Sequence, residues 1–594
     1  MLDTFRKTFY LVGKERPGRW IAVVGGAVVT SGFEMMGALL VFLLLGLIAD
    51  PGGELAVPLL GDIRGTFDHL DDQTFLLGAA AVLGAFFLVR VVLLIGYTYV
   101  KHRMAFNAGS RLSSRLAEGY LRLPYAFHLR RSSAELVRNA YQSVEEATRA
   151  CILPVIQVVG ESIIVVGLLG LMVTIAPAET GLAVLIVGAA AVLLLKVVQP
   201  RLKRLGRMGQ EMRKRTLASL QQSLYGIRDI KILGSETHFG RVYRKDRDRL
   251  ARSHYLYSTV SEMPRHVIET ALLGFILVLF GFSVLTQVAT EELLSTLGLF
   301  AYAGLRMMPS LQKIITGLNH IRFATTAVDQ VYDDVRLVEQ VETPSYEDVD
   351  LTFRDLWTVD DVTFSYEQTD RPAVSGVSLS IRPGEVVGIC GPTGGGKTTL
   401  VDLMAGILTP TAGKVAVDGV DIQSVVPAWF RRLGVVPQMV FLIDDTLRAN
   451  VALGVSEDEI DEGALREAIH LAQLDGFIAS LPDGLDTQVG ERGVRVSGGQ
   501  RQRIAIARAL YRRPEVLIFD EGTSALDNTT ESILISSLER LRGKHTILLV
   551  AHRLSTVKNC DKIVYIEDGA VLGIGTFTQL QLDSEGFRSL AENA

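Results

Sequence analysis

The sequence predicts an all-α transmembrane domain of six helices with long cytoplasmic helical extensions, followed by a soluble α/β domain. Of its 594 residues 48% are hydrophobic and 21% charged, and the mean hydropathy is +0.29, which is too apolar for a chain of soluble domains only. The apolar residues cluster in the first half. The net charge of -5 does not indicate a nucleic-acid-binding protein, which would carry an excess of basic residues. The three cysteines lie far apart, so neither a disulfide framework nor a zinc site is predicted.

A helix needs roughly 20 residues to cross a bilayer, and six apolar runs in the sequence are close to this length or longer. The first follows a basic segment and has no small-residue cleavage site, so it is predicted to be an uncleaved span and not a signal peptide. The predicted spans are 21–48, 75–100, 152–175, 181–198, 267–285 and 293–318.

The distribution of Lys and Arg between the spans predicts their orientation, because basic loops stay on the cytoplasmic side. The segment 50–74 holds Arg64 as its only basic residue, and the turns 176–180 and 287–292 hold none. By contrast, 101–150 and 201–266 are rich in Lys and Arg. We therefore expect these two segments and both termini in the cytoplasm.

The two basic segments show apolar residues at helical spacing, which predicts that the spans continue as helical stalks. Each is interrupted near its middle, at 123–125 and at 225–227, where a short transverse helix would fit. Residues 332–353 are acidic and polar, as in a linker. The predicted domains are thus a transmembrane domain at 1–331, a linker at 332–353 and a soluble domain at 354–594.

A phosphate-binding loop follows the short apolar run 386–390. Residues 391–398, Gly-Pro-Thr-Gly-Gly-Gly-Lys-Thr, fit the pattern G-x-x-x-x-G-K-[ST]. In this pattern the loop N–H groups face the phosphates, Lys397 reaches the terminal phosphates and Thr398 offers its hydroxyl to Mg²⁺. The residues predicted to bind nucleotide here are Gly391, Gly394, Gly396, Lys397, Thr398 and Thr399.

Two further motifs extend this prediction. The apolar run 516–520 reads as a buried parallel strand that ends in Asp520, a residue placed to lie near a metal ion, with Glu521 next to it to orient water. Between the loop and this strand, residues 496–500 read Val-Ser-Gly-Gly-Gln and precede a helical run at 504–510.

With these motifs in order, the second half resembles the nucleotide-binding domain of ABC transporters, an α/β P-loop domain with a helical subdomain. The resemblance implies ATP and Mg²⁺ as ligands, with Mg²⁺ on Thr398, Gln438 and Asp520. It implies that Tyr366 stacks on adenine, that Glu521 and Lys397 are catalytic, and that His552 contacts the γ-phosphate. The residues that it assigns to ATP through the signature and the D-loop are Ser497, Gly498, Gly499, Gln500 and Asp527. The sequence departs from the family at Val496, where Leu is usual, at Thr393 and Gly395, where Ser is frequent, and at Gly522, where Ala is usual.

The whole chain resembles ABC exporter half-transporters, in which the stretches 124–131 and 226–235 would be the coupling helices. Each ATP in this family lies between the phosphate loop of one subunit and the signature of the other, which implies a homodimer. The resemblance also implies a multi-pass protein of the bacterial plasma (inner) membrane that exports or flips an amphipathic substrate by alternating access.

Five charged residues fall at a similar depth within the predicted spans, where a charge costs about 2.5 to 3.5 kcal/mol. One interpretation is a set of ion pairs, such as Glu34 with Arg90 and Glu269 with Arg306. The other is that Arg90, Arg306 and the lower Arg265 hold an anionic headgroup, as guanidinium does for phosphate. The five residues are Glu34, Arg90, Glu161, Glu269 and Arg306.

The second interpretation resembles the arrangement in bacterial lipid-linked oligosaccharide flippases, which carry cavity arginines and an amphipathic segment in the first outer loop, here 62–70. A lipid-linked oligosaccharide pyrophosphate is therefore the first hypothesis for the substrate. A multidrug or lipid A exporter has the same ATP machinery and remains the alternative. An ATP-gated channel or regulator is less favoured, because Glu521, His552 and the signature are intact.

Overall fold

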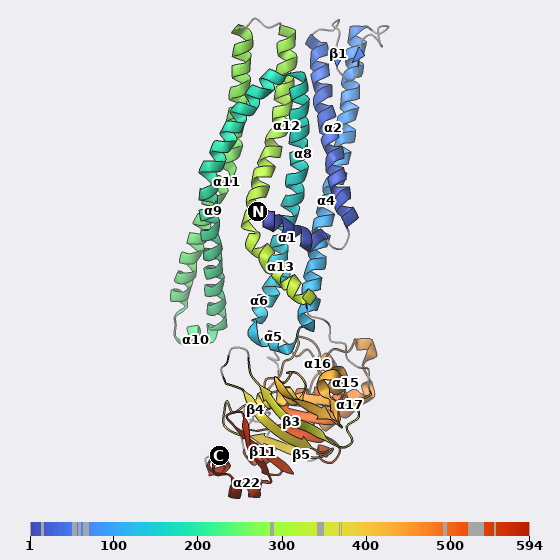
Figure 1. Ribbon diagram of the computed structural model, residues 1–594, viewed down its shortest axis with the longest axis vertical. Coiled ribbons are helices and arrows are strands. Elements are labelled where there is room, and N and C mark those ends of the chain that lie inside the picture. Colours follow the sequence, from blue (N-terminus) through green and yellow to red (C-terminus); the bar gives the residue numbers. More distant parts are fainter. Residues whose placement is uncertain are drawn as a thin grey trace. The chain divides into compact units, whose positions relative to one another are not determined.

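The computed structural model divides the chain into two compact units, which are described one at a time (Figure 1). The first unit comprises Met1–Leu123 and Arg131–Val341, and the second comprises Pro124–Arg130 and Glu342–Ala594. The residues that the structure describes are 2–13, 17–49, 56–57, 61–62, 71–285, 290–340, 350–366, 369, 371–490, 496–520, 540–551 and 554–592.

The first unit is helical apart from one small pair of strands (Figure 1). Each predicted span lies in one helix, and three of these helices continue well beyond the predicted span. The long helices are α2 (Pro17–Ala49), α4 (Asp72–Arg122), α8 (Leu153–Ile175), α9 (Pro177–Tyr225), α11 (Glu236–Leu285) and α12 (Thr290–Phe323). The shorter elements are α1 (Leu2–Gly13), β1 (Ala56–Val57), β2 (Gly61–Asp62), α6 (Ser133–Val137), α7 (Val144–Ala147), α10 (Ile227–Ile232), α13 (Thr325–Gln340) and the π-helical segments η1 (Arg138–Ser143) and η2 (Thr148–Ile152).

The long helices form two groups. Helices α9 and α11 lie side by side along their length and are joined by α10, whereas α2, α4, α8 and α12 pack with one another (Figure 1). Within the described residues, 5 helices are long and apolar enough to cross a membrane, and α12 is not among them. Arg306 and Lys313 lower the hydropathy of α12, and both pair with carboxylates of neighbouring helices.

The predicted stalks and their interruptions are present. Helix α4 ends at Arg122 and a short helix, α5 (Tyr125–Arg130), follows it in the second unit. Helix α9 ends at Tyr225, and α10 follows at once. Short helices thus occupy both places where the sequence predicts coupling helices.

The predicted linker begins too early. Residues 332–340 form the second half of α13, which belongs to the first unit, and 341–349 lie outside the described residues. Acidic composition suggested a linker, but Val328, Val331 and Val335 recur at helical spacing and are buried. Two of the acidic residues, Asp334 and Glu339, are bonded to other helices. The helix is therefore part of the packed first unit.

The second unit combines two sheets with helices, as predicted for an α/β domain (Figure 1). The larger sheet has six strands in the order β12-β11-β5-β10-β9-β8, of which all but β12 run parallel, and the smaller antiparallel sheet has the order β4-β3-β6-β7. The strands are β3 (Trp357–Phe364), β4 (Val374–Ile381), β5 (Val386–Cys390), β6 (Ala412–Val417), β7 (Val420–Asp421), β8 (Leu433–Val436), β9 (Val516–Asp520), β10 (Thr546–Val550), β11 (Lys562–Glu567) and β12 (Ala570–Gly575).

Helices cover the larger sheet and form a subdomain between β8 and β9. The subdomain contains α16 (Leu447–Val451), α17 (Glu462–Leu471), α18 (Asp475–Ala479) and α19 (Gly498–Tyr511). The other helices are α14 (Lys397–Met404), α15 (Val426–Arg432), α21 (Leu554–Val557), α22 (Phe577–Asp583) and α23 (Glu585–Glu592), and short 3₁₀ turns lie at Ile422–Ser424, Glu457–Glu459 and Gly484–Asp486. Between the two sheets, Trp357 and Trp429 meet edge to face at 5.2 Å in one of the hydrophobic cores. This core fixes α14 and α15 against the sheets.

Candidate functional site

The nucleotide motifs follow the carboxyl ends of neighbouring parallel strands. Strands β5, β10, β9 and β8 are adjacent, and Val550 of β10 is aligned with both Ile389 of β5 and Asp520 of β9. Ligands of open α/β sheets bind outside these carboxyl ends. Strand β5 leads into the phosphate loop, β9 ends at the predicted metal ligand Asp520, and Gln438 follows β8. The fold therefore brings motifs far apart in sequence to one edge.

The phosphate loop needs glycine for two separate reasons. A Cβ atom on Gly391 would lie 1.9 Å from the carbonyl oxygen of Ile566, and one on Gly396 would lie 2.4 Å from that of Ala373. Gly394 and Gly396 also have φ of +81° and +97°, which non-glycine residues rarely adopt. Gly391 and Gly396 thus leave no room for a side chain, and Gly394 and Gly396 have backbone conformations that favour glycine.

Lys397 is held by the phosphate loop itself. Its side chain is buried and its ammonium group donates hydrogen bonds of 2.9 Å to the carbonyl oxygens of Gly391 and Pro392. The carbonyl groups of the loop thus hold the positive charge of Lys397 next to the loop backbone. Thr399 is buried, and its hydroxyl lies 3.2 Å from that of Tyr366, which connects the predicted adenine platform to the loop helix α14.

The donor set fits Mg²⁺. Thr398 is exposed at the start of α14, Asp520 ends a neighbouring strand and Gln438 is exposed, so that a hydroxyl, a carboxylate and an amide oxygen are available. Hard oxygen ligands of this kind suit Mg²⁺. When bound, the ion would neutralise charge on the phosphate oxygens.

Sequence reasoning missed Asp402, which lies on α14 one turn beyond the loop. Burial, together with the charge of Asp520, raises the pKa of Asp402 to about 6. This carboxyl group therefore begins to bind protons as the pH falls toward 6. Its only signal in the sequence is a single acidic residue within the otherwise apolar second half of α14, residues 400–404.

The signature residues begin a helix. Ser497 is the N-cap of α19, where its hydroxyl accepts from the backbone N–H of Gln500 at 3.3 Å and its own N–H donates to the Gln500 side chain at 2.7 Å. This reciprocal cap stabilises the helix start. Ser497 and Gly498 are exposed, so the positive end of α19 is available to an anion.

Three predicted site residues, Glu521, Asp527 and His552, lie outside the described residues. Glu521 directly follows the last residue of β9, and His552 comes two residues after β10. Most of the predicted outer-loop segment 62–70 also lies outside the described residues.

Helix α5 lies close to the nucleotide residues within the second unit. Ala126 and Tyr366 pack against the same hydrophobic core, and Tyr125 lies within electrostatic reach of Asp402 and Tyr366. Burial is the first cause of the raised pKa of Tyr125. The sequence predicted a coupling helix here but not that it borders this site.

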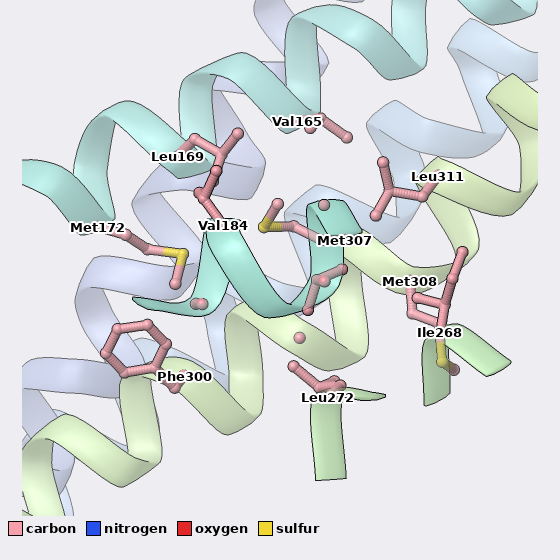
Figure 2. A pocket seen from close by; sticks show the side chains of 14 residues that line it. Val165, Leu169, Met172, Val184, Ile268, Leu272, Phe300, Met307, Met308 and Leu311 are labelled. Carbon is pink, nitrogen blue, oxygen red and sulfur yellow. The ribbon is translucent and has the colours of Figure 1, made fainter. Parts of the chain in front are cut away.

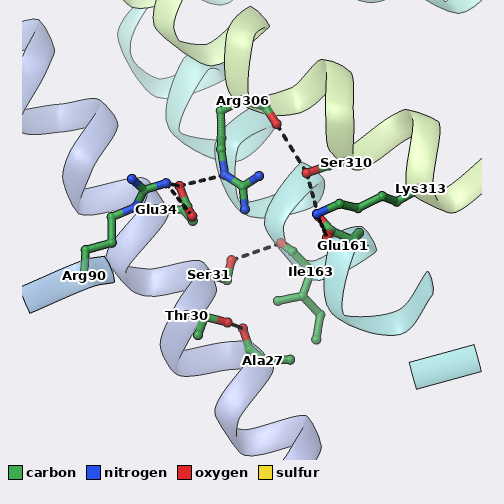
Figure 3. A network of polar contacts seen from close by, with 10 residues as sticks. All are labelled: Ala27, Thr30, Ser31, Glu34, Arg90, Glu161, Ile163, Arg306, Ser310 and Lys313. Atoms are coloured by element: carbon green, nitrogen blue, oxygen red, sulfur yellow. Dashed lines mark hydrogen bonds and ion pairs between the residues drawn. The ribbon is translucent and has the colours of Figure 1, made fainter. Parts of the chain in front are cut away.

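A second polar site lies among the membrane helices (Figure 3). Glu34 of α2 is fully buried, and its carboxylate lies 2.7 Å from a guanidinium nitrogen of Arg90 on α4 and 2.7 Å from Arg306 Nε on α12. Three helices therefore meet at one carboxylate. Two positive charges share one negative charge, and the arginine side chains remain 18% and 17% exposed.

The predicted pairing is thus half right. Arg90 does pair with Glu34, but Arg306 pairs with the same residue and not with Glu269. Glu269 is half-buried on α11 without an ion pair among the described residues, and Arg265 is exposed on the same helix. The structure places Arg90 and Arg306 together and Arg265 elsewhere.

A second cluster joins Glu161 of α8 to two residues of α12 (Figure 3). It accepts from the ammonium of Lys313 at 2.6 Å and from the hydroxyl of Ser310 at 2.7 Å. Here one positive charge matches one negative charge. The sequence analysis did not identify Lys313, since it lies at the end of the predicted span, where a lysine is common.

An apolar pocket of about 190 Å³ lies between the two groups of membrane helices (Figure 2). Helices α8, α9, α11 and α12 contribute its walls, and Met172, Met307 and Met308 supply three flexible thioether side chains. For scale, a cavity of about 150 Å³ can bind benzene. Met307 is the neighbour of Arg306 in the sequence, so α12 carries both the pocket and the charge cluster.

Comparisons with known proteins agree with this architecture. Residues 39–306 match the family model described as ABC transporter transmembrane region, and residues 374–524 match the model described as ABC transporter. The chain is 30% identical over 523 residues to an ATP-dependent lipid A-core flippase of Idiomarina loihiensis, with 87% of this chain and 88% of the relative covered. It is 31% identical over 532 residues to the protein of that name in Alkalilimnicola ehrlichii, with 88% of each covered. Among solved structures it is similar to a bacterial Atm1-family ABC exporter with ATP bound, at a TM-score of 0.75 and 23% identity, covering 96% and 98% of the two chains.

Proposed function

The chain belongs to the ABC transporter family as an exporter-type half-transporter, in which a membrane region is fused to an ATPase domain that couples ATP hydrolysis to transport, and we propose that it flips an anionic glycolipid of the lipid A-core type. The names of its relatives favour this substrate over the lipid-linked oligosaccharide pyrophosphate that the sequence first suggested. Both candidates carry phosphate on a lipid, so the two differ in headgroup and tail more than in charge.

The observation that carries the proposal is the surplus of positive charge at Glu34. Arg90 and Arg306 share that single carboxylate, and their side chains remain 18% and 17% exposed. A phosphate group would supply the missing negative charge, and guanidinium binds phosphate with paired hydrogen bonds. A hydrophobic cation would meet repulsion at this place, which is why a multidrug exporter is the weaker candidate.

The apolar pocket supports a lipid in preference to a small anion. It offers hydrocarbon and thioether side chains beside the helix that carries Arg306. A substrate with a phosphate and an alkyl chain would use both features of α12. Arg265 is exposed and lies outside the cluster, and we retain it only as a residue that the substrate meets on α11.

The test is ATPase activity in proteoliposomes with lipid A-core, a polyprenyl-pyrophosphate oligosaccharide or a hydrophobic cation as the added compound. We expect stimulation of about twofold or more by lipid A-core. Stimulation by the pyrophosphate lipid alone would assign the other glycolipid, and stimulation by the cation alone would contradict an anionic substrate.

Two variants separate charge from folding. The variant E34Q/R90Q/R306Q removes the whole triad and one net positive charge without leaving an unpaired ion. The control E161Q/K313Q removes one charge of each sign from another cluster on α12. The first should lose stimulation by the anionic lipid and the second should retain it. Equal behaviour of the two variants would argue against phosphate binding at the triad.

For ATP we propose the roles that the motifs imply. The loop amides and Lys397 stabilise charge on the transferring phosphoryl group, Glu521 orients the attacking water and His552 contacts the γ-phosphate. Tyr366 stacks on adenine. Supporting observations are the glycine-dependent loop and the buried ammonium of Lys397.

We also propose a homodimer in the inner membrane with both termini in the cytoplasm. The capped start of α19 is exposed, so Ser497 and Gly498 are available to an ATP held by the phosphate loop of a second copy. Gly499, Gln500 and Asp527 complete that half of the site by resemblance.

Cross-linking tests the dimer. The variant T393C/S497C should form a disulfide between chains that ATP increases, because Thr393 and Ser497 are exposed and the native Cys151, Cys390 and Cys560 are buried. The single variants T393C and S497C are the controls. A double variant that stays monomeric on denaturing gels with and without ATP would contradict the paired sites.

A further inference from the structure

Helix α13 carries acidic residues at intervals of five, Asp329, Asp334 and Glu339, and each bonds to other segments of the first unit. Asp329 accepts from Lys7 of α1 at 2.6 Å. Glu339 accepts from Tyr10 of α1 and from Arg115 of α4. The residue between them, Asp334, also accepts hydrogen bonds from several residues. The helix that leads toward the second unit is thus bonded to the first unit along its length.

Asp334 is almost completely buried and collects donors from three separate segments. Its Oδ2 accepts from the hydroxyl of Tyr120 on α4 at 2.6 Å and from the amide of Asn139 on η1 at 2.8 Å. Its Oδ1 accepts from Nη1 of Arg131 at 2.7 Å. A buried carboxylate with a charged donor and two neutral donors is strongly held in place.

Arg131 is the residue at which the chain returns to the first unit. The preceding helix α5 belongs to the second unit, where Ala126 packs against the core and Tyr125 lies within electrostatic reach of Tyr366 and Asp402. One peptide bond, from Arg130 to Arg131, therefore separates a helix beside the nucleotide residues from an ion pair inside the first unit. Helix α5 thus has two links to the first unit: Leu123 after α4 and Arg131 before α6.

We propose that Asp334 is a positioning residue of the transport cycle, which holds Arg131 so that movement of α5 is transmitted to α13, α4 and η1. The inference needs only the coupling of ATP hydrolysis to transport and does not depend on which lipid is carried. Asp334 is buried and bonds to residues of the first unit. Its role is to hold Arg131, the residue that follows α5, against α13, so that movement of α5 reaches α13 as well as α4.

The test compares variants that remove the ion pair with variants that do not. R131Q and D334N both break it, and R131Q carries less risk for folding because the Arg131 side chain is 35% exposed. Y120F removes one neutral donor from Asp334 but leaves Arg131 in place. D333N changes the exposed neighbour of Asp334 on the same helix.

Two quantities are measured for each variant: ATP hydrolysis without added substrate, and the distance between spin labels on L77C of α4 and L285C of α11. Both positions are exposed, and labelled chains are diluted with unlabelled chains so that one chain is observed at a time. The label distance is recorded without nucleotide and after trapping with Mg-ATP and vanadate, with the wild-type change as the reference.

We expect R131Q and D334N to lose about half or more of the nucleotide-driven change in label distance while hydrolysis stays within about threefold of wild type. Y120F and D333N should keep the full change. A full change in R131Q would overturn the proposal, and so would an equal loss in Y120F, since that would mean general loosening of the helix contacts. Failure of D334N to fold would leave R131Q to decide. Neither result depends on the substrate, so the proposed glycolipid is tested separately.

Discussion

Replacing Glu521 by glutamine is expected to leave ATP binding intact and to lower ATP hydrolysis by about 100-fold or more. The residue directly follows Asp520 at the carboxyl end of β9, two strands from the β5 end that leads into the phosphate loop. A carboxylate there can orient and activate water, whereas an amide of the same shape cannot accept the proton. Binding of a fluorescent ATP analogue and phosphate release are the two measurements.

The contrast is Lys397→Ala, which should weaken nucleotide binding itself. The ammonium group is held by two loop carbonyls, so alanine removes the positive charge that the phosphates would meet and leaves those carbonyls unopposed. Lys414→Ala, at an exposed position of β6 in the same domain, is the matched control and should behave as wild type. Glu521→Gln that hydrolyses ATP at the wild-type rate would remove Glu521 from the catalytic role.

Replacing Glu34 by alanine is expected to lower the free energy of unfolding by about 3 kcal/mol, because two partly buried arginine side chains would lose their shared counter-ion. Its carboxylate is fully buried and joins α2, α4 and α12 (Figure 3). The midpoint of thermal unfolding in detergent micelles is the measurement. Arg90→Gln should cost less, since Arg306 would still neutralise Glu34.

Two further variants test whether unpaired charge causes the loss of stability in Glu34→Ala. E34Q/R90Q/R306Q should recover most of the lost stability, because no unpaired charge is left in the bundle. Glu269→Gln should have little effect, since Glu269 has no ion pair among the described residues. A loss at Glu269 as large as that at Glu34 would contradict the charge triad.

The phosphate loop and the capped start of α19 could be predicted because their chemistry is local in the sequence. A glycine loop between a strand and a helix needs φ angles and close approaches that only glycine provides, and Gly391 and Gly396 have them. Capping of α19 by Ser497 and Gln500 is likewise a property of neighbouring residues. Asp402 was missed because its raised pKa comes from burial and from Asp520, which is distant in the sequence.

The membrane charges could be predicted only in part. Hydropathy places Glu34, Arg90 and Arg306 in spans, but the rotation of each helix decides which charges face one another. That rotation brings both arginines to Glu34, leaves Glu269 without an ion pair in the described part of the chain and joins Lys313 to Glu161. Composition also suggested a linker where α13 continues, because acidic residues that bond to other helices look the same in sequence as acidic residues in water.

The sequence by itself determined the two-part architecture, the membrane helices with their stalks, and the ATP motifs, because hydropathy, helical period and glycine-dependent loops act over short stretches of chain. Only the tertiary structure decided the ion pairs of Glu34, the position of α5 beside Tyr366 and the bonding of Asp334 to Arg131. These contacts join residues from separate helices, and their geometry depends on how whole helices pack against one another.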